Sequence, residues 1–289
     1  MGPDSQQARW AIQEAKAFLD PYRKLIHSLI LIGSYALGHA RKDSDVDFLV
    51  LTRGGEKVSR LSRILFDWQL SLQSHQEKTN PVKLQITDFD EKRIEHLFEV
   101  SSPLAHSARH GEVIWDKGWF KTLLSRPYPK WPTKEGAIEA FTRWIIWQYY
   151  YSILELKRDI SRHHGPEGLC TETSRCQGHL GGDILARVIS RMLYVTLPAR
   201  GFLPLSKLEA SAMAVETYGR TAWRPIMLAM SIIRKERLMY HREFRVLFPF
   251  ARSLFCECLR ICGPRHPKVL EALKHNAEIY RAMREKADR

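Results

Sequence analysis

One stretch near the start of the chain, residues 29–51, constrains the fold more than any other. Two apolar runs, each long enough for a strand, are separated there by a Gly-Ser pair and a polar connector. The pattern predicts a strand over residues 28–33, a turn into a short helix, and a second strand over residues 45–52. The first part of the chain is therefore expected to contain a sheet.

The second predicted strand starts with two carboxylates. Side chains at i and i+2 of a strand share one face, about 6.6 to 6.8 Å apart, so Asp45 and Asp47 are expected to point the same way. Two nearly adjacent carboxylates on a rigid element repel each other unless a cation lies between them. Mg²⁺ prefers oxygen ligands and is typically held by one or two carboxylates plus substrate phosphates. The pair therefore predicts a Mg²⁺ site.

The turn between the two predicted strands suits a phosphate. Gly33 has no side chain that would keep a phosphate away from the backbone, and amides at the start of a helix attract anions. The hydroxyl of Ser34 adds a further polar group at the same point. Together with the two carboxylates, Gly33 and Ser34 predict a site for a metal-bound triphosphate.

These residues carry a family resemblance. Gly33-Ser34, Gly38 and Ser44-Asp45-x-Asp47 resemble the signature of the polymerase-β-type nucleotidyltransferase superfamily, particularly its minimal nucleotidyltransferase and antibiotic-nucleotidyltransferase branches. The resemblance implies that the two aspartates bind two divalent metal ions, Mg²⁺ or alternatively Mn²⁺. It also implies that the Gly-Ser turn holds the triphosphate of an NTP, with ATP as the expected nucleotide. It is specific over residues 28–52 and extends to about residue 117.

One part of the superfamily pattern is missing. Members carry a third carboxylate on a neighbouring strand, where it completes the metal site or acts as the base for the acceptor hydroxyl. Residues 82–87 alternate like a strand, but the polar face of that strand contains no acid. Either Asp88 or Asp90, just past the strand, reaches the metals, with Asp88 as the catalytic candidate, or Gln85 occupies the position and general-base help is weak or comes from elsewhere.

A Pro-rich segment divides the chain. Three prolines within residues 126–132 exclude both helix and central strand, so this segment is predicted to be a linker. Residues 1–125 are expected to form the catalytic domain, and residues 133–289 a helical domain that binds substrate or partner. The expected fold class is α+β: a nucleotidyltransferase-type mixed sheet flanked by helices, followed by an all-α helical-bundle domain.

The spacing of apolar residues predicts the helices. Residues 91–110 are expected to be helical, with the helix stopping at Gly111, acting as a C-cap. In the second domain, the aromatic stripe of the first helix is interpreted as bundle core rather than as a stacking platform for bases, with Trp144 widening its buried face. A later helix is expected from Trp223 to about Phe248.

The positive charge is concentrated in the second half of the chain. Residues 1–130 contain 19 Lys and Arg against 16 Asp and Glu, which leaves 26 against 16 of the chain's 45 and 32 for residues 131–289. The net charge of +13 therefore divides into +3 and +10. The basic second domain favours an anionic partner such as nucleotide phosphates, a nucleic acid or an acidic protein, and a solvated cationic surface is the alternative.

The second domain also resembles the C-terminal bundle of antibiotic nucleotidyltransferases, or a HEPN-like bundle. Residues 198–207 resemble a bend in those bundles where a lysine faces the nucleotide. The resemblance thus implies that Lys207 is a phosphate ligand.

Composition bounds the class of protein. A hydrophobic content of 44% over 289 residues is enough for two modest cores. No apolar run approaches the ~20 residues that a membrane helix needs, and the first residues lack the apolar segment of a signal peptide. Five cysteines, an odd number, fit reduced thiols. We therefore expect a cytoplasmic protein without a membrane partner.

The sequence as a whole predicts a metal-dependent nucleotidyltransferase. It would move a nucleoside monophosphate from an NTP to a hydroxyl acceptor and release pyrophosphate. The acceptor is a nucleic acid, a protein or a small molecule, with the charge leaning toward the first two. The alternative is a catalytically lapsed nucleotide-binding module or antitoxin-like regulatory subunit of the same fold, which the missing acid favours.

Overall fold

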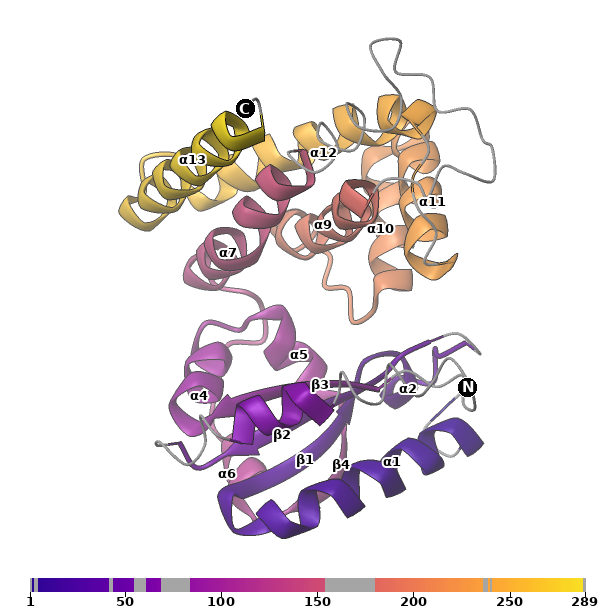
Figure 1. The fold of residues 1–289 in the computed structure, drawn as a ribbon, viewed down its shortest axis with the longest axis vertical. Helices are drawn as coiled ribbons and strands as arrows, with labels where there is room; N and C mark the ends of the chain where they lie inside the picture. Colours follow the sequence, from indigo (N-terminus) through magenta and orange to yellow (C-terminus); the bar gives the residue numbers. More distant parts are fainter. Residues whose placement is uncertain are drawn as a thin grey trace. The chain divides into compact units, whose positions relative to one another are not determined.

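The computed structural model describes residues 2, 5–41, 44–54, 61–68, 84–153, 180–235, 239 and 241–287. The chain forms two compact units, Met1–Lys130 and Trp131–Arg289 (Figure 1). The division between them falls inside the predicted linker of residues 126–132. None of the helices in the described ranges combines the length and hydropathy that a membrane span requires.

The first unit is built on a sheet of four strands: β1 (Ile26–Ile32), β2 (Val46–Thr52), β3 (Leu84–Asp90) and β4 (Glu112–Asp116). Their order in the sheet is β3-β2-β1-β4. Strand β1 runs antiparallel to β2 and β4, whereas β2 and β3 are parallel. The expectation of a mixed sheet is therefore confirmed.

Helices cover both faces of this sheet because the side chains of β1 and β2 alternate between two cores. One core joins Leu29, Leu31, Phe48 and Val50 to α1, and Figure 1 shows α1 lying along the sheet. The other joins Ile30, Ile32, Leu49 and Leu51 to buried residues of α4, α5 and α6. The helical segments of this unit are α1 (Gln6–Leu19), the 3-10 helix η1 (Asp20–Leu25), α2 (Gly33–Ala36), residues 61–68, α4 (Glu91–Glu99), α5 (Pro103–Arg109) and α6 (Trp119–Leu124).

The second unit is helical wherever it has regular structure in the described ranges, as predicted. Its segments are α7 (Lys134–Ala140), a π-helical turn η2 (Phe141–Ile145) continuing as helix to residue 153, α9 (Leu180–Thr196), η3 (Pro198–Arg200), α10 (Lys207–Tyr218), α11 (Arg220–Lys235), α12 (His241–Cys262) and α13 (Pro267–Ala287).

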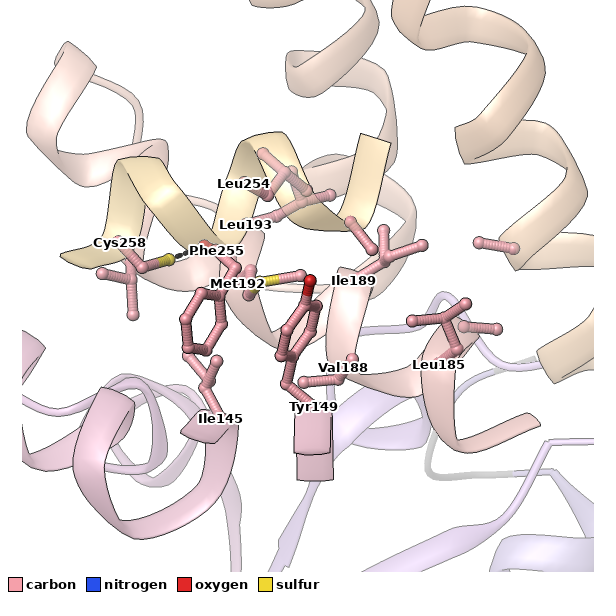
Figure 2. Packing of buried hydrophobic residues seen from close by; sticks show 14 of the residues in the cluster. Ile145, Tyr149, Leu185, Val188, Ile189, Met192, Leu193, Leu254, Phe255 and Cys258 are labelled. Carbon is pink, nitrogen blue, oxygen red and sulfur yellow. Dashed lines mark hydrogen bonds between the residues drawn. The ribbon is translucent and has the colours of Figure 1, made fainter. Parts of the chain in front are cut away.

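Part of the core of the second unit lies between the helix that runs from α7 to residue 153, α9 and α12. Figure 2 shows Tyr149 beside Phe255, whose rings stack with centroids 4.2 Å apart. The thiol of Cys258 donates to the carbonyl oxygen of Met192, which ties α12 to α9. Burial raises the pKa of Cys258 well above that of an ordinary thiol, so this cysteine is a small apolar core residue.

Residues 91–110 are largely helical, as predicted, but they form two helices, α4 and α5, with Ser101 between them at φ +50°. Two other predictions for helices were wrong. The single helix expected from Trp223 to about Phe248 is two helices, α11 and α12. Trp144, expected to be buried, is 47% exposed.

Candidate active site

The centre of the site is the turn that follows β1. Gly33 adopts φ +73°, a conformation that L side chains rarely adopt, and it begins α2. Asp47 pairs with Ile32 across the β1–β2 ladder, one residue from that glycine. A Cβ atom built on Gly33 would lie 2.5 Å from Oδ2 of Asp47. The Asp47 carboxylate therefore lies against the Gly33 backbone, and only glycine leaves room for it there.

Helix α2 is held by its own apolar residue. Tyr35 is 1% exposed and belongs to the core that includes α1, and its hydroxyl lies 3.5 Å from Oε1 of Gln7. Ser34, next to Gly33, is half-buried. The N-cap residue of α2 makes no side-chain capping hydrogen bond. Backbone amides at the start of an uncapped helical turn are donors suited to an anion.

Asp45 lies just before β2, two residues from Asp47, and is half-buried. Within the described ranges, no three or more His, Cys, Asp and Glu side chains gather into a group that could hold a metal ion. A divalent ion on this pair of carboxylates would thus need further oxygen ligands from elsewhere, which is how Mg²⁺ is commonly held with substrate phosphates. The donor set fits Mg²⁺ in the presence of a triphosphate.

Strand β3 places a glutamine beside the acidic pair. Gln85 is the register partner of Asp47 in the parallel β2–β3 ladder, and register partners share a face of the sheet. Gln85 is also exposed. It is therefore the β3 residue that adjoins Asp47.

Asp88 was expected just past the strand, and this placement is wrong because β3 continues to Asp90. Asp88 pairs with Val50 and lies three residues from Gln85, so it belongs to the opposite face. Its carboxylate accepts a hydrogen bond from the hydroxyl of Ser62. The register therefore argues against a catalytic role for Asp88. Asp90 is likewise accounted for, because its side chain caps α4 by accepting from the amide of Arg93.

Lys207 lies in the second unit, where it is the first residue of α10 and is exposed. Two hydrogen bonds fix the start of that helix. The hydroxyl of Ser206 accepts from the amide of Glu209, and the Glu209 carboxylate accepts from the amide of Leu205 at 2.8 Å. This arrangement resembles a capping box, which the Ser-x-x-Glu spacing of the sequence would have predicted, except that Glu209 reaches the amide of the residue before the N-cap.

Comparison with known proteins shows what the first unit is similar to. Residues 12–104 match the family model of the nucleotidyltransferase domain. No curated protein matches the sequence significantly. Among solved structures, the fold resembles spectinomycin adenyltransferase AAD(9) from Enterococcus faecialis, solved with ATP and spectinomycin. The TM-score is 0.54 at 14% identity, and the match covers 86% of this chain and 98% of that one. The resemblance implied by the Gly-Ser and Asp-x-Asp motifs is confirmed over residues 12–104, which are similar to a nucleotidyltransferase domain.

Proposed function

We propose that this protein transfers a nucleoside monophosphate from an NTP, with ATP as the donor, to a hydroxyl group and releases pyrophosphate. The observation that carries the proposal is the close approach of the Asp47 carboxylate to the Gly33 turn. A nucleotide whose terminal phosphates occupy this turn would have its reacting phosphate next to the acidic pair. The nucleotidyltransferase family model over residues 12–104 supports the use of an NTP.

Each residue of the site has a distinct task in this proposal. The amides that follow Gly33 and the Ser34 hydroxyl would bind the terminal phosphates. Asp45 and Asp47 would hold Mg²⁺. When bound, such an ion neutralises charge on the phosphates and stabilises the leaving pyrophosphate. Holding donor and acceptor in line would be the main contribution of the protein.

At Gln85 the site has an amide where a carboxylate could act as a general base. An amide can accept a hydrogen bond from the acceptor hydroxyl and so orient it, but it cannot take up the proton. The site would thus work on hydroxyl groups that need little help from a protein base. The alternative function, a lapsed nucleotide-binding or antitoxin-like regulatory module, is favoured by this same substitution of an amide for an acid.

The structural neighbour, solved with ATP and spectinomycin, supports a small hydroxylated molecule as the acceptor. The charge of the second unit narrows this class. Proteins hold polycationic molecules with acidic residues, whereas residues 131–289 carry a net charge of +10. We therefore propose neutral or anionic small hydroxylated molecules as acceptors, with spectinomycin itself as the comparison compound.

The test is pyrophosphate release from ATP and Mg²⁺ over a panel of such acceptors. The wild-type protein should release pyrophosphate with at least one acceptor, and Asp45→Ala/Asp47→Ala should not. Asp88→Asn is the matched control, because it removes a carboxylate from the other face of the same sheet and should keep the activity. Tight ATP binding without release for any acceptor would support the lapsed module. Equal release by the wild type and the double variant would refute the proposed site.

A further inference from the structure

The first helix of the second unit has an aromatic face that the proposed transfer does not use. Trp144 and Trp147 are 47% and 46% exposed, and Tyr151 follows one turn later on the same side. The rings of Trp147 and Tyr151 stack with centroids 5.1 Å apart and an angle of 7° between their planes. We call Trp144, Trp147, Gln148 and Tyr151 the aromatic face. Two neighbouring tryptophans in water are unusual on a protein surface and mark contact sites.

Positive charge lies next to the aromatic face at Trp144. The guanidinium carbon of Arg143 lies 5.5 Å from the ring centroid of Trp144, and that of Arg191, from α9, lies 5.8 Å from it. Removal from water, followed by the charge of Arg187, lowers the pKa of Arg191 from its ordinary value. Arg143 also approaches Glu139 at 3.9 Å, so its charge is partly balanced. Arg143 and Arg191 therefore place positive charge beside Trp144.

Gln148 contributes a polar group to the same face. It lies one turn from both Trp144 and Tyr151, and its side-chain carbonyl oxygen is buried without a hydrogen-bond donor among the described residues. A buried acceptor without a donor costs free energy until a ligand supplies the donor. The helix also makes a π-helical turn at Phe141–Ile145, a distortion that is frequent at functional sites.

From these observations we propose that the aromatic face binds the bases of a single-stranded nucleic acid. Planar rings stack on exposed aromatic side chains, an exocyclic amino group of a base supplies the donor that Gln148 needs, and arginines contact phosphates. Trp144 and Tyr151 are seven residues apart, which is about 10 Å along a helix, so the face is longer than one base. The net charge of +10 over residues 131–289 favours a polyanion over a mononucleotide.

The aromatic stripe of this helix thus has two parts. Phe141, Ile145 and Tyr149 belong to the core, as predicted from their spacing. Trp144 and Trp147 lie outside it, and for them the stacking platform is the better interpretation.

The test is titration of the full-length protein with a single-stranded oligonucleotide of mixed sequence, followed by intrinsic tryptophan fluorescence and by anisotropy of a labelled strand. Trp147→Ala should weaken binding about 5- to 100-fold, the range for loss of one base–aromatic stack, and Trp147→Phe should retain most of it. Trp223→Ala is the matched control, because Trp223 is 55% exposed on α11 and should be dispensable. Thermal unfolding of each variant verifies that it is folded.

The outcomes separate this proposal from the proposed transfer reaction. Asp45→Ala/Asp47→Ala should bind the oligonucleotide as the wild type does, whether or not the protein transfers nucleotides. The proposal is overturned if the wild type shows no binding, if duplex DNA or AMP binds equally well, or if Trp223→Ala weakens binding as much as Trp147→Ala does.

Discussion

At the scale of single residues, the site depends on what Gly33 lacks. The backbone conformation at φ +73° and the carboxylate of Asp47 both exclude a side chain there, for separate reasons. The first reason concerns strain in the chain, and the second concerns the position of an active-site carboxylate. Because backbone strain and the approach of Asp47 are independent effects, they can be separated with a second glycine that has a positive φ but no close neighbour.

Gly33→Ala should abolish nucleotide transfer, because the new methyl group would displace Asp47. Gly118→Ala is the control, since Gly118 has φ +93° but nothing within 4 Å of an added Cβ. We expect both variants to lose about 1–2 kcal/mol of stability through left-handed backbone strain, measured by denaturant unfolding. Only Gly33→Ala should lose pyrophosphate release. Loss of activity in both variants would show that strain alone accounts for the effect.

Gln85 allows the opposite experiment, a gain of function. Gln85→Glu places a third carboxylate about 4.8 Å from Asp47 across the ladder, and a general base contributes about 10²–10⁴-fold to a rate. We expect transfer to rise by at least about tenfold, with a rate that increases as pH rises through the pKa of the new carboxylate. The measurement is pyrophosphate release from pH 4 to 8.

The control for this gain is the unfolding temperature of the variant, which does not depend on its activity. Three neighbouring carboxylates repel one another, so Gln85→Glu should unfold at a lower temperature than the wild type in EDTA, and Mg²⁺ should remove the difference. A variant with a lower melting temperature in both buffers and no faster transfer would contradict the placement of Gln85 beside the metal ligands.

At the scale of elements, the sequence predicts what depends on local pattern. The strands follow from apolar runs, and the two faces of the sheet from alternation along β1 and β2. Gly111 was predicted as a helix C-cap, but the structure gives it another role: an added Cβ would lie 2.7 Å from Cγ2 of Ile30 and 2.8 Å from the oxygen of Leu31. Such an approach between distant segments leaves no periodic signal in the sequence.

The break between α4 and α5 has a similar tertiary cause. Ser101 is buried, and its hydroxyl donates to the carbonyl oxygen of Pro129 at 2.9 Å. That oxygen also accepts from Arg109, and Nε2 of His106 lies 3.0 Å from the Ser101 hydroxyl. Helical spacing over residues 91–110 cannot reveal a partner 28 residues away. The same holds for Trp144, whose spacing fits a core that it does not join.

This cluster makes the first unit sensitive to acid. Burial, with the charges of Arg109 and His110, lowers the pKa of His106 to about 4. The unfolded chain binds a proton near pH 6.5, so the stability that neutral His106 permits is complete above pH 6.5 and is lost as the pH falls toward 4. Between pH 7 and 4.5 we expect the wild type to lose about 2 kcal/mol more than His106→Gln does in urea unfolding. His110→Gln, which removes only the smaller of the two charges acting on His106, should reduce this loss slightly and leave most of it in place.

At the scale of the whole molecule, the charge of the sequence differs between its two halves: acidic and basic residues nearly balance in the first, whereas basic residues predominate in the second. The structure divides the chain at the same place, within the Pro-rich segment. The fold class could be predicted because a motif of known family lies in the first half and helical spacing dominates the second. The acceptor could not, because specificity depends on which side chains converge in space. A whole-molecule test should therefore report on the nucleotide without needing the acceptor.

Stabilisation by ligand gives such a test. A ligand that binds only the folded state at 100 times its dissociation constant stabilises a protein by about 2.7 kcal/mol. Because the metal ligands we propose are completed by phosphates, Mg²⁺ with ATP should raise the unfolding temperature, whereas Mg²⁺ alone or ATP in EDTA should raise it little. Asp45→Ala/Asp47→Ala should lose the response, and Asp88→Asn should keep it. Equal stabilisation with and without Mg²⁺ would show that the triphosphate binds without the metal, and the two aspartates would then need another role.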